Sequence, residues 1–323
     1  MRMLITLIWS IILVGCSQIE EPKRQIAFTF DDGPRTSGPI FEGEDRTEAL
    51  IRSLDKADIK SVWFFVTTNN IDRENNNGDA RLKRYMEAGH QLANHSHSHM
   101  WFNKTDTDAY IADMDKARDL LANYGETRPY YRYPYLDEGR SVEKRDAMVA
   151  ALAERGMFNG YVTVDTYDWH MDALLGEALK AGHDVNMDML RETYVNSLVQ
   201  SVEFYDNIAQ EVLWRSPKHV LLLHENDLAA MFIGDLAQAL RDKGWEIISP
   251  EEAFRDDIAK YVPKTLFLGQ GRISAIADDK GMAREDLVHE RENEDFLRAE
   301  FIEKGLLPQA EVKPEAEPSA ETP

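Results

Sequence analysis

Two neighbouring carboxylates, Asp31 and Asp32, follow directly behind a strongly apolar run in this chain of 323 residues. Gly33 and Pro34 come next and predict that the chain turns there. Carboxylates at the end of a strand can hold a metal ion or take a proton from water. Because neighbouring side chains of an extended chain point opposite ways, we expect one carboxylate to bind a metal and the other to face a water molecule. On its own, such a segment is also typical of an ordinary turn.

Two histidines four residues apart, His95 and His99, lie behind another apolar run. That spacing can present both imidazoles to one ion from a single turn. With Asp32 they form a set of two histidines and one carboxylate, which leaves coordination positions open for water, as catalytic zinc sites do. His97 lies between them and is predicted to point elsewhere. The alternative is a polar loop without a metal.

Seven strand-like runs alternate with helix-like segments, and together they must position these side chains. The strand-like runs span residues 26–30, 61–66, 90–94, 130–133, 158–164, 219–223 and 245–248. The helix-like segments span residues 47–57, 79–88, 106–124, 141–155, 187–213 and 227–243. This alternation predicts parallel pairing and an α/β sheet or barrel. Parallel strands end at one edge of a sheet, so we expect the polar clusters behind five of the runs to meet there.

Two loops are predicted to border that edge. Residues 69–78, with five asparagines and a glycine, predict a flexible loop, and residues 171–186 predict a sizeable loop behind the fourth polar cluster. The strand-helix alternation stops at about residue 263. We expect a helical extension over residues 263–308, with a charged helix at 283–303, and a disordered acidic tail over 309–323.

Five short motifs, taken in order, resemble those of the polysaccharide deacetylases, also called carbohydrate esterase family four or the NodB-homology domain. They are Thr29-Phe30-Asp31-Asp32-Gly33-Pro34, His95-Ser96-His97-Ser98-His99, Arg132-Tyr133-Pro134-Tyr135, Asp165-Thr166-Tyr167-Asp168-Trp169 and Leu222-Leu223-His224. The resemblance covers about residues 25–254, and five ordered motifs are far more specific than any one. The chain departs from the family pattern at Leu136 to Gly139 and at His170, which puts in doubt the sugar rather than the reaction.

The resemblance implies a fold and a role for each motif residue. The fold is a distorted seven-stranded (β/α) barrel with parallel strands, which we assign to residues 25–262. Asp31 would be the general base and His224 the general acid, and Arg132 would orient the base while Asp168 tunes His224. The resemblance further implies that Asp32, His95 and His99 hold a divalent metal, usually zinc, that Tyr135 stabilises the oxyanion through its backbone N–H, and that Trp169 and Leu222 line the pocket for the acetyl methyl group.

The implied function is a metal-dependent hydrolase that removes acetyl groups from an N-acetylated polysaccharide or oligosaccharide. Metal-activated water would attack, with Asp31 as base and His224 as acid. An O-acetyl esterase acting on a plant or algal polysaccharide would use the same groups. A third hypothesis, from another class, is a non-catalytic carbohydrate-binding lipoprotein. Its signature would be the loss of a catalytic or ligand residue, and none has been replaced.

The N-terminus resembles a bacterial lipoprotein signal. A basic start at Arg2 precedes a short apolar stretch at residues 4–14, and Leu13-Val14-Gly15-Cys16 follows, which contains the only cysteine of the chain. We expect residues 1–16 to direct export, Cys16 to carry a lipid that anchors the protein in the cell envelope, and residues 17–24 to form a linker. An ordinary secretory signal is the alternative.

The charge of the chain bears on its partners. The formal net charge is -21, with no visible cluster of Lys and Arg, which argues against nucleic acid as a partner. We expect a solvated acidic surface. The resemblance to the deacetylases implies an acetylated carbohydrate as the substrate.

Overall fold

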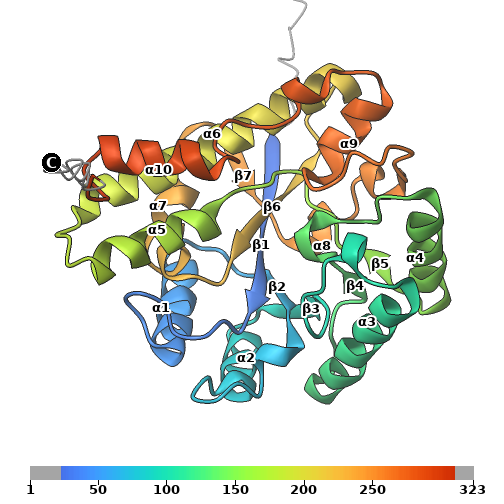
Figure 1. Cartoon of the computed structure of the whole chain (residues 1–323), viewed down its shortest axis with the longest axis horizontal. Helices are drawn as coiled ribbons and strands as arrows, with labels where there is room; N and C mark the ends of the chain where they lie inside the picture. The colour runs from blue at the N-terminus through green and yellow to red at the C-terminus, as the bar shows by residue number, and fades with distance from the viewer. Residues whose placement is uncertain (1–22, 310–323) are drawn as a thin grey trace, which may run out of the picture.

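The computed structural model describes residues 23–309, which form a curled, seven-stranded sheet surrounded by helices (Figure 1). All strand pairs are parallel, in the order β5-β4-β3-β2-β1-β6, and β7 pairs with β1 beside β2. The strands are β1 Arg24–Gly33, β2 Trp63–Val66, β3 Gln91–Asn94, β4 Tyr130–Tyr131, β5 Phe158–Asn159, β6 Lys218–His224 and β7 Trp245–Ile247. The seven parallel strands predicted from the sequence are confirmed.

The segment after β5 nearly closes the sheet into a barrel. At its start, the Gly160 N–H donates to Tyr131 O on β4 at 2.7 Å. At its end, Val164 forms a bridge with Leu221 of β6, and Leu222 N donates to Val164 O at 3.0 Å. Gly160 is required in this crossing, because a Cβ there would lie 2.5 Å from Phe65 Cε1. The predicted distorted (β/α) barrel is therefore confirmed.

Ten helices cover the sheet in the described part of the chain. They are α1 Gly43–Lys56, α2 Gly78–Glu87, α3 Thr107–Leu121, α4 Val142–Glu154, α5 Asp168–Lys180, α6 Met187–Leu213, α7 Asp227–Asp242, α8 Pro250–Ala253, α9 Gly271–Asp279 and α10 Glu294–Glu303. Figure 1 shows α3 and α4 on one side of β1 and α5, α6 and α7 on the other. Each of the six predicted helices is present, within a few residues of its expected ends.

The predicted loop over residues 171–186 is wrong, because α5 occupies most of it. Its buried side chains recur at helical spacing: Met171, Leu174, Leu175 and Ala178. This short apolar stripe packs against the barrel core, and that tertiary burial stabilises a helix whose sequence signal was masked by the polar motif at its first turn.

The second predicted loop, residues 69–78, is tied to the end of β1. The Asn70 side chain donates to Asp32 O at 2.9 Å, and the buried Asn76 side chain donates to Pro34 O at 2.9 Å. These bonds satisfy backbone carbonyls that a turning strand end leaves without partners. The asparagines predicted to loosen this loop therefore fasten it to the first motif.

The C-terminal extension shares the core of the barrel. Ile273, Ile276, Leu297 and Phe301 are buried in the same apolar cluster as the strands. The charged helix predicted at 283–303 is shorter than expected, because α10 begins only at Glu294, after a single 3₁₀ turn at residues 284–286. Figure 1 shows α10 lying along α5 and α6. Residues 263–308 are thus part of the wall of the domain.

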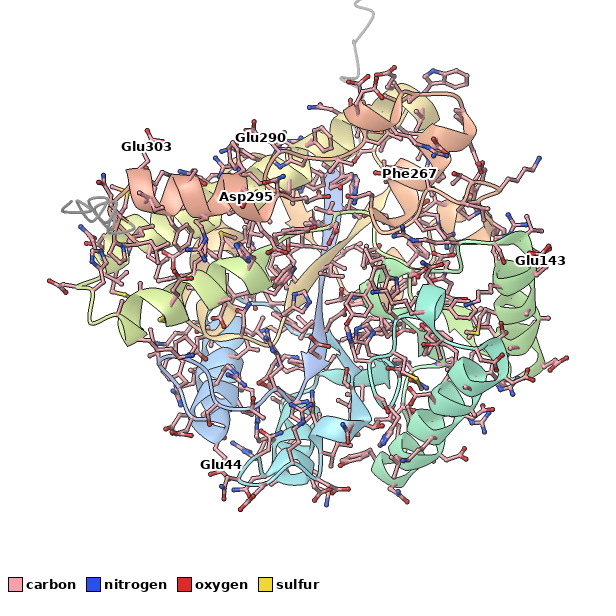
Figure 2. All side chains as sticks on the ribbon, in the orientation of Figure 1. Glu44, Glu143, Phe267, Glu290, Asp295 and Glu303 are labelled. Atoms are coloured by element: carbon pink, nitrogen blue, oxygen red, sulfur yellow. The ribbon has the colours of Figure 1, made fainter. Side chains whose placement is uncertain are left out.

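Several predictions concern residues that the structure does not describe. The signal peptide, Cys16, most of the linker and nearly all of the acidic tail lie outside residues 23–309 and stay predictions. Within this range, no helix is both long and apolar enough to cross a membrane. The acidic side chains of Glu44, Glu143 and Glu303 point outward from the periphery (Figure 2), as a solvated acidic surface requires.

A buried ion cluster lies behind the first motif. Glu225, fully buried, accepts from Arg81 Nη2 at 2.7 Å, from Arg46 Nε at 3.3 Å and from the Tyr85 hydroxyl at 2.8 Å. Its second oxygen accepts the Arg35 N–H at 2.7 Å. Arg46 and Arg81 also donate to Arg35 O. The cluster thus fastens the loop behind β1 to the barrel.

Glu225→Gln is expected to destabilise the fold by about 3–5 kcal/mol, because it leaves buried guanidinium charge uncompensated. Urea unfolding followed by circular dichroism measures this. Glu87→Gln is the matched control, since Glu87 forms an exposed ion pair with Arg84 that is worth ~0–1 kcal/mol. An equal effect of the two substitutions would contradict the role given to the cluster.

Candidate active site

The predicted site residues meet at a cavity of about 420 Å³ at the carboxyl edge of the sheet, here called the main cavity. Eight of them line it directly: Asp31, Asp32, His95, His99, Tyr135, Trp169, Leu222 and His224. The two others, Arg132 and Asp168, lie behind this lining and contact Asp31 and His224. The sequence prediction that the five motifs converge is therefore correct in its geometry.

The strand register sets the relation between the first and fifth motifs. β1 and β6 pair from Gln25 with Lys218 to Asp31 with His224. Asp31 and His224 therefore occupy the same rung of the sheet. Asp31 O also accepts the N–H of Glu225 at 3.2 Å, which extends the pairing one residue further.

Asp32, His95 and His99 form a cluster with the geometry of a metal site. Asp32 Oδ1 lies 3.8 Å from His95 Nε2 and 3.4 Å from His99 Nε2, and one ligand atom from each residue lies within 4.8 Å of the others. His95 Nδ1 is 2.9 Å from Arg132 O, so Nδ1–H donates and Nε2 keeps its lone pair toward the cluster. Two imidazoles and one carboxylate fit a zinc ion with open positions.

The two aspartates do not point in opposite directions, as extended chain predicted. Asp31 Oδ2 and Asp32 Oδ1 lie 3.7 and 3.8 Å from the same atom, His95 Nε2. The reason is the left-handed backbone of Asp32, with φ of 66°, which ends the alternation of the strand. Both carboxylates therefore face one reaction centre.

The local charges favour the protonation states that a metal requires. Burial lowers the pKa of His99 to about 4, although the Asp32 carboxylate opposes this. Burial would raise the pKa of Asp32, but the adjacent imidazoles, above all that of His99, hold it below its usual value. At neutral pH the cluster thus combines a neutral imidazole with an ionised carboxylate, the forms in which both bind metal.

Asp31 is held by a buried guanidinium. Arg132 Nη1 donates to Asp31 Oδ1 at 2.6 Å and to the Thr29 hydroxyl at 2.8 Å, while Nε donates to Gly160 O at 2.6 Å. Arg132 is fully buried, with its guanidinium 3.7 Å from the centre of the Phe65 ring. The ion pair leaves Asp31 Oδ2 directed toward the histidine cluster.

His224 is held by Asp168 in a comparable way. His224 Nδ1 lies 2.7 Å from Asp168 Oδ1, and His224 N and the Asn226 side chain donate to Asp168 Oδ2. Burial would lower the pKa of His224, but the Asp168 carboxylate outweighs it and the pKa is raised. With Nδ1 bonded to Asp168, Nε2 is the nitrogen available to the cavity.

Strained backbone gathers around this site. Left-handed φ angles at residues other than glycine cost about 1–3 kcal/mol each and persist where the surroundings enforce them. Five such residues belong to the first three motifs or follow them directly: Asp32, Ser96, His99, Tyr135 and Leu136. This concentration is typical of a functional site.

The remaining histidines make structural contacts. His97 Nδ1 bonds the Thr68 hydroxyl at 3.0 Å, and His219 bonds Thr163 and Asp206 in the core. His170, one of the predicted departures from the family pattern, does not line the main cavity but is buried, with Nδ1 3.9 Å from Glu294. It turns away because α5 replaces the expected loop. Leu136, the other predicted departure, does line the main cavity.

The sequence interpretation missed several residues of the cavity. Arg35 and Arg140 line it, and so do Leu268, Gly269 and Gln270 of the C-terminal extension. A second cavity of about 280 Å³, here called the side cavity, shares Asp32, Arg35 and His99 with the main one and is also lined by Arg73. Arg35 directly follows the first motif and Arg140 lies shortly after the third, so both were detectable from their positions in the chain. Residues 268–270 carry no local signal, since only the fold brings them there.

Comparisons with known proteins agree with this geometry. The family model described as polysaccharide deacetylase matches residues 18–157. A peptidoglycan-N-acetylglucosamine deacetylase of Bacillus cereus is 23% identical over 246 residues, which cover 75% of this chain and 73% of that protein. A probable peptidoglycan-N-acetylglucosamine deacetylase of Arthroderma benhamiae is 30% identical over 162 residues, 50% of this chain and 33% of that protein.

A solved structure shares the fold. The chitin deacetylase of Colletotrichum lindemuthianum superposes with a TM-score of 0.50 and 20% identity, covering 72% of this chain and 88% of that chain. The matched family model and the two relatives are named for the same kind of protein that the five ordered motifs resemble, and the solved structure shows the shared fold. Over residues 18–157, this chain is therefore similar to the polysaccharide deacetylases.

Proposed function

We propose that this protein is a metal-dependent hydrolase that removes acetyl groups from an N-acetylated polysaccharide or oligosaccharide. The observation that carries the proposal is the Asp32, His95 and His99 cluster, with Asp31 beside it and His224 on the same rung of the sheet. The similar proteins are named for N-acetylglucosamine of peptidoglycan and for chitin, which supports an N-acetylated sugar as the substrate.

Asp32, His95 and His99 would hold the ion. Two nitrogen ligands and one oxygen ligand favour zinc. A divalent ion there supplies Lewis-acid activation of water and of the acetyl carbonyl. Asp31, locked by Arg132 with one oxygen toward the cluster, takes the proton of the attacking water. Arg132 fixes the direction of the Asp31 carboxylate, so it acts as a positioning residue.

His224 donates the proton that the departing amine needs. Its raised pKa keeps a larger share of the imidazole protonated near neutral pH, and Asp168 directs Nε2 to the cavity. Base and acid therefore act from adjacent strands.

Tyr135 and two apolar side chains complete the proposed chemistry. The Tyr135 N–H has no hydrogen-bond acceptor among residues 23–309, and left-handed backbone at Tyr135 sets its direction. We assign it to the oxyanion of the tetrahedral intermediate. Leu222 and Trp169 line the cavity and would receive the acetyl methyl group.

The function is tested by acetate release from chitin oligosaccharides, peptidoglycan and acetylated xylan, with and without a chelator. We expect release from an N-acetylated substrate, abolished by chelation and restored by zinc. Release from the xylan alone would favour the O-acetyl esterase. Binding without any release would favour the non-catalytic carbohydrate-binding protein.

Asp31→Asn is expected to lower kcat by about 10²–10⁴-fold, because the amide cannot accept the proton of water. Zinc content, measured by elemental analysis, should stay near one ion per chain, since Asp32 and the histidines are unchanged. Asp45→Asn on the exposed face of α1 is the control and should retain full activity. An unchanged rate in Asp31→Asn would remove the assigned base.

Asp168→Asn is expected to shift the alkaline limb of the kcat/KM profile to lower pH. The acid is active only when protonated, so activity falls as the pH rises through the pKa of His224. Without the carboxylate, burial dominates and that pKa falls. Steady-state rates from pH 5 to 10 measure the shift. A limb at the same pH in both proteins would show that His224 is not the titrating acid.

A further inference from the structure

Three arginines around the site have no carboxylate partner. Among the described residues, the arginines without an ion pair are Arg35, Arg52, Arg73, Arg140 and Arg241. Arg35 and Arg140 line the main cavity, and Arg35 and Arg73 line the side cavity. In a chain with 58 acidic and 37 basic residues, partners for arginine are abundant. The unpaired cations nevertheless gather at the site.

The carboxylates of the main cavity do not account for these cations. Asp31 already pairs with Arg132, and Asp32 faces the two histidines. Burial raises the pKa of Asp165 to about 7, so this carboxyl group is only partly ionised near neutral pH. Neither Arg35 nor Arg140 forms an ion pair with these carboxylates, so both guanidinium groups can bind an anion from outside the chain.

Arg35 is built into its position. Its N–H donates to the buried Glu225, and its carbonyl accepts from Arg46 and Arg81, so its backbone is fixed on both sides. Its Nη1 is buried without a hydrogen-bond partner among the described residues. An orphaned buried donor is costly unless a ligand or water satisfies the group. A bound anion would lower that cost.

Arg140 belongs to a different connection, directly before α4. Its guanidinium lies 5.8 Å from the centre of the Trp101 ring, and that ring packs against Tyr135 with 5.6 Å between centroids. A cation–π contact leaves the guanidinium N–H groups free for bidentate bonds, and Lys104 Nζ lies 4.2 Å from the centre of the same ring. Arg35 and Arg140 therefore enter one cavity from two loops, each held by its own contacts.

We propose that Arg35 and Arg140 select an acetylated glycan that carries anionic groups, carboxylate or sulfate, near the sugar that is deacetylated. Arginine binds both groups through paired, charge-assisted hydrogen bonds. Arg73 extends the cationic lining into the side cavity, where a neighbouring sugar unit would lie. This inference rests on the proposed function and narrows its substrate class.

The test compares charged and neutral substrates of one backbone. Oligosaccharides of alternating N-acetylglucosamine and glucuronic acid carry carboxylates, and carboxyl reduction makes their neutral counterparts. Chitin oligosaccharides with and without 6-O-sulfate form the sulfate arm. For the zinc-loaded wild type we expect kcat/KM about tenfold or more higher on a charged member, chiefly through KM and falling with added salt. A preference for the charged substrate in only one of the two comparisons identifies carboxylate or sulfate as the recognised anion.

Arg35→Gln and Arg140→Gln are expected to reduce the ratio of charged to neutral kcat/KM toward one, and Arg140→Lys should restore part of it. Arg52→Gln is the matched control, because Arg52 is also unpaired but lies exposed on α1. Circular dichroism confirms folding of each variant. Equal wild-type rates on charged and neutral substrates would overturn the proposal. An equal loss on both in Arg35→Gln would show that Arg35 acts through Asp32.

Failure of the proposed function is distinguishable from failure of this inference. If no substrate releases acetate, calorimetry on the zinc-loaded protein still measures binding. Tighter binding of the charged oligosaccharide by the wild type than by Arg140→Gln would support anion recognition without the reaction. Equal affinities for charged and neutral oligosaccharides would reject it.

Discussion

The register between β1 and β6 is the constraint on which the site depends. It aligns Asp31 with His224, while β2 pairs with the other side of β1 and brings Asp31 opposite Phe65. A shift by one residue would turn every side chain of β1 to the opposite face and separate the two groups. The alternation of large and small side chains opposes such a shift, because Ile26, Phe28 and Phe30 fill one face of the strand while the smaller Ala27 and Thr29, which are equally buried, fill the other. Burial in the core thus fixes the chemistry at the edge.

Behind this edge the barrel holds unusual amounts of buried charge. Arg132 with Asp31, and Glu225 with two arginines, lie almost wholly out of water. Such pairs contribute little net stability, because desolvation offsets most of their attraction. These pairs instead fix the orientation of the side chains, because the buried guanidinium of Arg132 can bond Asp31, Thr29 and a main-chain carbonyl only in one arrangement. The site is accordingly rigid where the proposed reaction needs defined geometry.

The C-terminal extension contributes to the same site. Arg272 N donates to Val162 O at 2.7 Å, which docks the start of α9 against the segment that closes the barrel. The three residues that precede it in the cavity wall, Leu268 to Gln270, follow from this docking. A segment outside the five motifs therefore shapes the cavity that the motifs create. Variation in this wall would change the shape of the cavity without altering the residues of the five motifs.

Local sequence patterns determined much of the fold and of the candidate site of this protein. Alternating strands and helices predicted a parallel α/β sheet or barrel, and the family resemblance implied the barrel. The ordered motifs predicted which side chains converge, because parallel strands end at a common edge of the sheet. The facing of Asp31 and Asp32 toward one histidine required the left-handed backbone of Asp32. Helix α5, the unpaired arginines and the wall from residues 268–270 depended on long-range packing. Only the tertiary structure decides such features, because their stabilising contacts come from residues far apart in the chain.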